Sequence, residues 1–160
     1  MEKIITVDRS TSFDPSLFFG QEGWSTSDGD EDGRALNLTE VDLERIEFEA
    51  ISFKKNETSI SGEKWLRRLK KTGNILLDAK FLEAIKKDTS VIPTSWKKKL
   101  KGRPGAPCTV AFPGVVLVCP QGGRFVLTLM WYKGEWDINP LGLAGDWEAV
   151  DFAAVLPRVN

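Results

Sequence analysis

Hydrophobic positions in the first third of the chain follow the two-residue period of extended structure. Residues 3–7, KIITV, form a β-branched run that predicts a short buried strand. Residues 34–53 alternate in LNLTEVDL and again in RIEFEAISF, which predicts strands with one apolar side. A helix over 40–52 is the alternative, because Thr39 and Asp42 loosely resemble a capping box.

The last third predicts an antiparallel meander onto which the ending GDWEAVDFAAVLPRV packs. Its three β-branched or aromatic runs, TVAFPGVVLVC, RFVLTLMWY and EWDI, are separated by PQGG and by Lys133-Gly134. A two-residue turn at Lys133-Gly134 places Trp131 opposite Trp136. A turn at PQGG places Phe112 opposite Trp131, and Pro113-Gly114 then forms a bulge or bend within the first run.

Helical periodicity is confined to the middle of the chain. Ser59 or Ser61 can cap a helix that runs to about Thr72, with Trp65, Leu66 and Leu69 as its apolar stripe. Asp78 can cap a second helix, AKFLEAIKK. The pattern therefore predicts an α+β fold: a mostly antiparallel sheet, in which N-terminal strands join the C-terminal meander, with two short helices packed on it.

The stretch STSDGDEDG reads as an exposed acidic loop. Asp28, Asp30 and Asp32 occupy the first, third and fifth positions of a calcium-loop template, and Gly33 occupies the sixth. The twelfth position, however, is Thr39, which cannot supply the bidentate carboxylate that the template requires. We therefore expect a solvated loop and no metal site.

Length and composition indicate one ordinary globular domain over residues 1–160. The chain is 41% hydrophobic and 28% charged, which argues against disorder. No apolar run approaches the roughly 20 residues of a membrane span, and the N-terminus lacks the apolar core of a secretory signal. We expect a cytoplasmic protein with no membrane contact and, because no glycine-rich phosphate loop is present, no cofactor.

The residue types that most enzymes rely on are scarce. Histidine is absent, which removes the commonest general base and metal ligand. Cys108 and Cys119 are too few for a zinc site and are interpreted as small core residues. Four carboxylates cluster around turns, and a solvated surface is the favoured interpretation for them: Glu135, Asp137, Asp146 and Glu148. The sequence leans against an enzyme, with a carboxylate- or metal-dependent hydrolase as the enzymatic alternative.

Charge divides the chain into three parts: an acidic strand and loop part, a basic helical part and a β-rich part. Residues 1–53 carry 4 basic and 13 acidic side chains, net −9; residues 54–103 carry 15 and 5, net +10; residues 104–160 carry 3 and 5, net −2. Either the first two parts neutralise each other within the fold, or the basic part faces an external polyanion. Both interpretations stay open at this point.

Aromatic residues are interleaved with the cations in KWLRRLKK and SWKKKLKGR, the combination that single-stranded nucleic acid binding uses. Trp65 lies in a helical apolar stripe and is expected in the core, whereas Trp96 suits the core and a binding surface equally. The candidate binding residues are Lys64, Arg67, Arg68, Lys70, Lys71, Trp96, Lys97, Lys98, Lys99, Lys101 and Arg103.

Several segments in order resemble a group of uncharacterised bacterial proteins: ITVDRSTSFDP, FFGQEGW, LNLTEVDL, RLKKTGNILLDAKFLEAI, VIPTSWK and VLTLMWYKGEW. The resemblance covers most of the chain. It implies a single unit that includes the β-rich end, with PGVV inside one strand, which separates the two cysteines. It assigns no catalytic or binding residue.

These observations lead to a functional hypothesis. We expect a non-enzymatic binding or adaptor domain that contacts a protein, a larger assembly or a polyanion through the basic segment 54–103. A nucleic-acid-binding accessory protein is the alternative within the same class of function.

Overall fold

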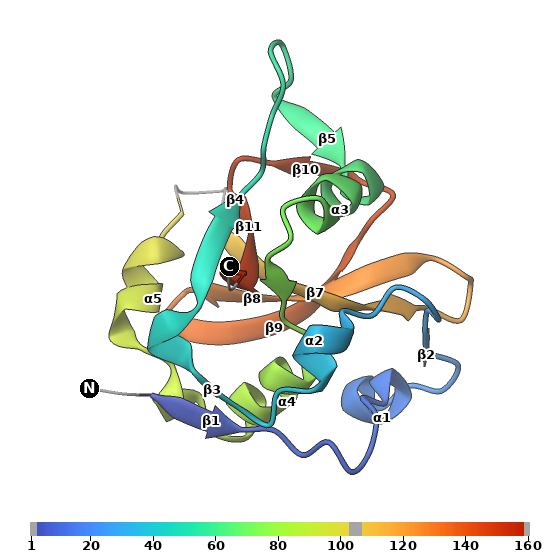
Figure 1. The fold of residues 1–160 in the computed structure, drawn as a ribbon, viewed down its shortest axis with the longest axis vertical. Helices are drawn as coiled ribbons and strands as arrows, with labels where there is room; N and C mark the ends of the chain where they lie inside the picture. Colours follow the sequence, from blue (N-terminus) through green and yellow to red (C-terminus); the bar gives the residue numbers. More distant parts are fainter. Residues whose placement is uncertain (1–2, 103–106, 159–160) are drawn as a thin grey trace.

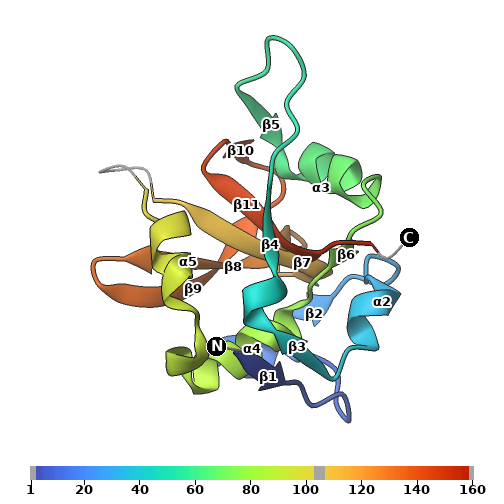
Figure 2. The ribbon, with the colours of Figure 1, turned by 60° about the vertical axis from the view of Figure 1, so that its left-hand side comes forward.

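A seven-stranded sheet organises the computed structural model, which describes residues 3–102 and 107–158 (Figures 1 and 2). Its main path runs in the order β4-β11-β7-β8-β9, with β2 added to β7 and β6 added to β11. Two further antiparallel pairs, β1 with β3 and β5 with β10, lie outside this sheet. The strands are β1 (Ile4–Thr6), β2 (Ser25–Thr26), β3 (Glu40–Asp42), β4 (Glu47–Ala50), β5 (Ser59–Ser61), β6 (Ile75–Leu76), β7 (Thr109–Val118), β8 (Arg124–Tyr132), β9 (Glu135–Gly142), β10 (Asp146–Glu148) and β11 (Asp151–Leu156).

Short helices pack against the strands, and the predicted α+β class is confirmed. Strand pairing is antiparallel throughout the described residues, except that β11 and β7 run parallel. The helices are α1 (Pro15–Phe19), α2 (Gly33–Leu36), α3 (Gly62–Lys70), α4 (Ala79–Lys87) and α5 (Thr94–Lys99), with 3₁₀ turns η1 (Leu43–Arg45) and η2 (Thr89–Val91). None of the described helices has the length and apolar character that crossing a membrane requires.

The sheet has a hydrophobic core on each face, because successive side chains of a strand point to opposite sides. On β7, Val110 and Phe112 belong to the larger core, which α4 and α5 cover, whereas Ala111 belongs to the smaller one. The smaller core contains Trp65 of α3 and Trp147 of β10. The three central strands are therefore shared by both cores.

The C-terminal meander forms as predicted, with one error in register. Lys133 and Gly134 both have positive φ, 50° and 79°, as a two-residue type I′ turn requires, and Trp131 pairs with Trp136. Phe112, however, pairs with Leu127 and not with Trp131. The predicted bulge at Pro113-Gly114 causes the difference, since the register shifts between Phe112 and Leu117.

The bulge in β7 lets another segment approach closely. The backbone N–H of Gly114 donates to the carbonyl of Leu77 at 2.8 Å, and its carbonyl accepts from Asp32 at 2.9 Å. An added Cβ at Gly114 would meet the carbonyl oxygen of Leu76 and lie 2.8 Å from the backbone nitrogen of Asp78. Glycine at this position therefore allows the residues between β6 and α4 to cross β7.

The N-terminal and helical predictions are confirmed in part. Residues 34–53 do form strands, β3 and β4, but the 3₁₀ turn η1 separates them, α2 precedes them, and no helix spans 40–52. Helix α4 has the predicted bounds, and Ser61 caps α3 by accepting from the N–H of Lys64 at 3.2 Å. Asp78 sits at the N-cap position of α4, yet its side chain makes no capping hydrogen bond. The prediction that it caps this helix is wrong.

Candidate functional site

Three exposed cations form the candidate site, here called the α3 cationic face: Lys64 and Arg67 of α3, and Lys71 at its C-cap. They are three and four residues apart, so they project from the same side of the helix. The opposite side buries Trp65, Leu66 and Leu69 in the smaller core. Within the described residues, no ion pair involves any of the three cations.

The N-terminal end of α3 is bonded to the segment between β9 and β10. The N–H groups of Gly62 and Glu63 donate to the carbonyls of Gly145 and Leu143, each at 3.0 Å. Trp65 stacks on Trp147, with ring centroids 4.1 Å apart and ring planes inclined by 20°. These contacts fix the position of the α3 cationic face relative to the sheet.

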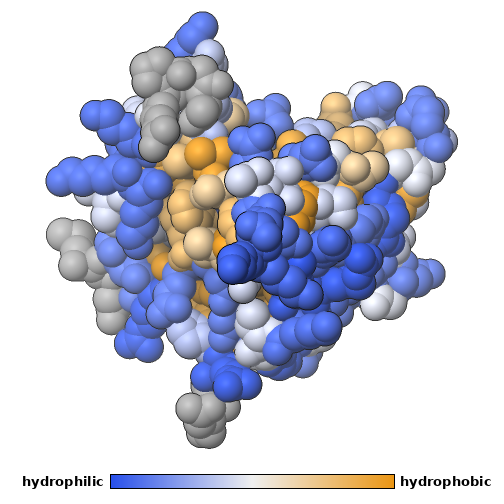
Figure 3. Space-filling view, turned by 90° about the horizontal axis from the view of Figure 1, so that it is seen from above, coloured by the Kyte–Doolittle hydropathy of each residue, from blue (hydrophilic) through white to orange (hydrophobic). Residues whose placement is uncertain are grey.

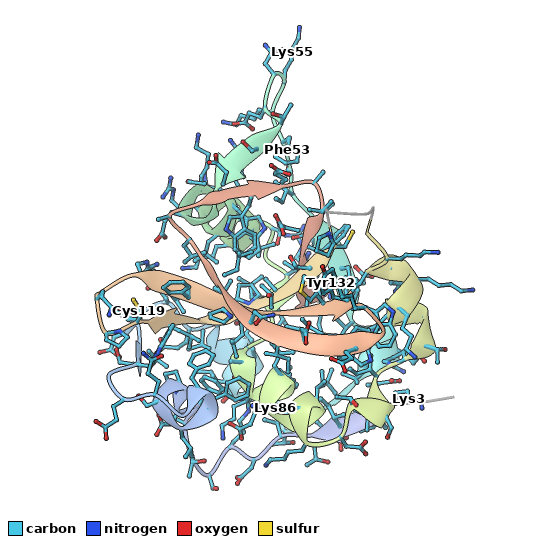
Figure 4. All side chains as sticks on the ribbon, turned by 180° about the vertical axis from the view of Figure 1, so that it is seen from behind. Lys3, Phe53, Lys55, Lys86, Cys119 and Tyr132 are labelled. Atoms are coloured by element: carbon cyan, nitrogen blue, oxygen red, sulfur yellow. The ribbon has the colours of Figure 1, made fainter. Side chains whose placement is uncertain are left out.

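A projecting loop joins β4 to β5, which pair with other strands, and adds two further exposed cations beside α3; because of its shape it is here called the hairpin. Lys54 and Lys55 lie near its turn, where Asn56 has a positive φ of 71°. Figure 4 shows Lys55 at the far end of the hairpin, directed away from the body of the molecule. Seen from above, hydrophilic side chains cover the centre and lower right of this face, whereas apolar side chains show left of centre and at the upper right (Figure 3). Both lysines belong to the basic segment 54–103 but were not among the predicted binding residues.

Arg68 and Lys70, two of the predicted binding residues, form ion pairs within the molecule. Arg68 bonds to both carboxylate oxygens of Glu57, at 2.7 and 2.9 Å, and also donates to the carbonyl of Ser52. The Arg68 guanidinium lowers the pKa of Glu57 to about 2. Lys70 lies 3.1 Å from the carboxylate of Asp30. These two cations therefore stabilise the hairpin and the acidic loop.

Asp30 connects the acidic first third of the chain with the sheet. Its carboxylate accepts from Arg124 at 2.9 Å and from the hydroxyl of Ser27 at 2.6 Å, in addition to Lys70. The Arg124 hydrogen bond holds the pKa of Asp30 well below its usual value. Glu63 and Asp30 together raise the pKa of Arg124 above its ordinary range. At this point the acidic and basic parts do neutralise each other within the fold.

The cations of α5 lie on a different side of the molecule from α3 (Figures 1 and 2). Lys97 places its ammonium 4.5 Å from the ring centroid of Trp131, and Lys99 lies 5.3 Å from that of Phe48. Lys98 and Lys101 are exposed. The predicted binding residues therefore form two separate groups and not one surface, while Arg103 lies outside the described residues.

Trp96 was predicted as a candidate binding residue, but it is a core residue with no exposed surface. Its side chain is 0% exposed and packs edge-to-face on Phe48, with ring centroids 4.9 Å apart. The burial of Trp96 follows from helix α5, which begins after Pro93. Its geometry directs Trp96 into the core and the neighbouring lysines toward solvent. The short helix was not predicted, and for that reason the orientation of Trp96 stayed open.

Two aspartates of the acidic loop bind donors of the chain itself. Asp32 caps α2 by accepting from the N–H of Arg34 at 3.0 Å, and it also accepts from the N–H of Leu76 at 2.9 Å. Asp30 accepts from Arg124. Across residues 3–102 and 107–158, no group of three or more His, Cys, Asp or Glu side chains is arranged to hold a metal ion.

Comparison with known proteins gives no match to a family model, to a curated protein or to a solved structure.

Proposed function

We propose that this chain is a non-enzymatic binding protein that docks on an acidic surface of a partner protein through the α3 cationic face. The observation that carries the proposal is the line of Lys64, Arg67 and Lys71 on a helix whose inner side is anchored in the core. The last lies seven positions after the first, which corresponds to roughly 10 Å along the helix axis. Lys54 and Lys55 extend the same cationic surface along the hairpin.

The environment of the aromatic rings favours a protein partner over single-stranded nucleic acid. Stacking of bases on exposed rings contributes much of the affinity of proteins that bind single strands. In KWLRRLKK and SWKKKLKGR the tryptophans are 2% and 0% exposed, so neither ring is available next to the cations. What remains is charge on a convex helix, which suits carboxylates on a folded partner and steers its association.

Charge reversal on α3 tests the proposal against a matched control. The test variant is Lys64→Glu/Arg67→Glu/Lys71→Glu, and the control is Lys87→Glu/Lys98→Glu/Lys101→Glu, which changes net charge equally at exposed sites elsewhere. A fluorescent poly-glutamate peptide serves as the acidic probe, and binding is measured by anisotropy at several salt concentrations. We expect salt-sensitive binding to the wild type, at least about tenfold weaker binding to the test variant, and a clearly smaller loss in the control.

Two results would contradict the proposal. Equal loss in the two variants would mean that only net charge matters. Tight binding of single-stranded or duplex DNA, without retention of the peptide at the same ionic strength, would instead assign the α3 cationic face to nucleic acid.

A further inference from the structure

A small cavity lies away from the α3 cationic face, between α2, the start of α4 and the loop that follows β1. Its volume is about 190 Å³. Drug-sized ligands occupy pockets of roughly 300–1,000 Å³, so this cavity admits only a smaller molecule. The polar residues that line it are Arg9, Thr11, Ser12, Thr26, Glu31, Asp78 and Lys80.

Arg9 and Asp78 form one wall of the cavity and neutralise each other. Two guanidinium nitrogens of Arg9 bond to the two carboxylate oxygens of Asp78, at 2.8 and 3.0 Å. The guanidinium also donates to the carbonyls of Ala35 and Leu38, at 2.7 and 2.8 Å. With nearly all of its donors occupied in this way, Arg9 has a structural role and is not the main ligand group.

Lys80 is a buried charged group of the cavity with incomplete pairing. Its side chain is 5% exposed, and its ammonium donates to the Thr11 hydroxyl at 3.2 Å and to the Glu83 carboxylate at 3.4 Å. An ammonium has three donors, and charge-assisted bonds are normally about 2.7–2.9 Å long. Both contacts are long for a charge that has lost most of its water, which leaves Lys80 able to bind a further anionic group.

Glu31 carries the opposite charge on the same lining. The residue is exposed, and one of its carboxylate oxygens accepts from the N–H of Gly29 at 3.1 Å. Lys80 is buried and Glu31 is exposed, so the lining offers one positive charge away from solvent and one negative charge in contact with it. The hydroxyls of Thr11 and Ser12 supply neutral donors and acceptors beside them.

We propose that this cavity binds a small zwitterion of the α-amino acid type. The carboxylate of the ligand bonds to the Lys80 ammonium and the Thr11 hydroxyl, and its ammonium lies at the mouth against Glu31. The carboxylate of Glu83 already neutralises part of the charge of Lys80. The ligand carboxylate adds a second, closer acceptor for the same ammonium. The pairing of both ligand charges selects a zwitterion over a simple anion or amine.

Calorimetric and thermal-shift titrations of the full chain test this inference. The probes are alanine and serine as zwitterions, acetate and ethylamine as single-charge analogues, and inorganic phosphate. We expect saturable binding and a rise in melting temperature with a zwitterion only. Lys80→Met and Glu31→Gln should each weaken that binding at least about tenfold, because a ligand charge loses its partner. Lys87→Met, an exposed change on the same helix, should leave it unaltered.

An amide-resolved NMR titration keeps the test independent of folding. The signals of Thr11 and Ser12 should shift with the zwitterion in the wild type and stay in place in the folded Lys80→Met variant. Absence of saturable binding by any of the twenty amino acids would overturn the inference. So would equal shifts in Lys80→Met, or binding of acetate or phosphate as tight as that of the zwitterion.

Discussion

At the scale of single residues, Asp78 shows how strongly burial changes the role of a side chain. The residue is 1% exposed and both of its carboxylate oxygens bond to Arg9. Removal of one partner from a buried ion pair typically lowers the free energy of unfolding by about 3–5 kcal/mol, because it leaves an uncompensated charge. The side chain of an N-cap residue contributes about 1 kcal/mol to the free energy of unfolding, and asparagine replaces aspartate at such a position with almost no loss of stability.

Asp78→Asn therefore separates the two roles. We expect it to lower the free energy of unfolding in urea by about 3 kcal/mol or more, because the amide cannot neutralise Arg9. The control is Asp14→Asn, at a true cap where Asp14 accepts from the N–H of Leu17 at 3.2 Å; it should change stability by less than about 0.5 kcal/mol. A loss equally small in both variants would show that the Arg9 pair does not stabilise the fold.

The pair of Glu57 and Arg68 makes a prediction about pH. In the folded chain the pKa of Glu57 is about 2, against an ordinary value of 4.5. Since the folded-state pKa is depressed, the stabilisation is fully present above about pH 4.5 and is lost as pH falls toward 2. The stability difference between the wild type and Glu57→Gln should thus be constant above about pH 5 and vanish near pH 2. An NMR titration that places the Glu57 carboxyl near 4.5 would contradict this.

At the scale of elements, Gly114 determines how the connection between β6 and α4 crosses β7. A methyl group there would collide with backbone atoms of Leu76 and Asp78, which cannot rotate away. We expect Gly114→Ala to lower stability by about 3 kcal/mol or more, at or beyond the upper end of ordinary overpacking. The control is Gly33→Ala at the start of α2, where the space is open, and it should be neutral or slightly stabilising. Calorimetric melting of both variants checks the difference, and equal melting temperatures would exclude a tight crossing at β7.

The same crossing limits what the sequence could predict about the elements. Turn chemistry predicted the pairing of Trp131 with Trp136, because Lys133-Gly134 is local. The PQGG register failed because β7 advances five residues, from Phe112 to Leu117, while β8 advances two, from Leu127 to Phe125. The size of that bulge depends on β6 and α4, which contact β7 only in the folded chain.

The candidate site was predictable to a similar degree. Helical spacing correctly placed Trp65 in the core and Lys64 and Arg67 on the surface of α3. No local pattern could show that α3 and α5 lie on different sides of the sheet, or that Glu57 and Asp30 pair with neighbouring cations. These features depend on tertiary structure. They reduce the candidate site from a basic segment of 50 residues to the three cations of the α3 cationic face.

At the scale of the whole molecule, the separation of charge along the chain is only partly retained in space. Arg124, from the β-rich part, joins Asp30 of the acidic part to Glu63 of the basic part. Because one guanidinium bridges all three parts, local repulsion within the acidic loop is relieved without an external partner. The cations that remain free of ion pairs on α3 are therefore an excess over what the fold itself uses, which is why they carry the proposed function.

The two cores that share one sheet lead to a prediction about folding. Strands β7, β8 and β11 place alternate side chains in both cores, so neither core retains its packing surface once the sheet is lost. Residues 1–160 should therefore unfold in one cooperative transition, with coincident circular dichroism and fluorescence curves. Trp96→Phe in the larger core and Trp65→Phe in the smaller one should each lower the free energy of unfolding by about 1–3 kcal/mol at most. Each should move the whole unfolding curve and not a part of it. A variant that moves only part of the signal, leaving a second transition at the wild-type midpoint, would show that the two faces fold independently.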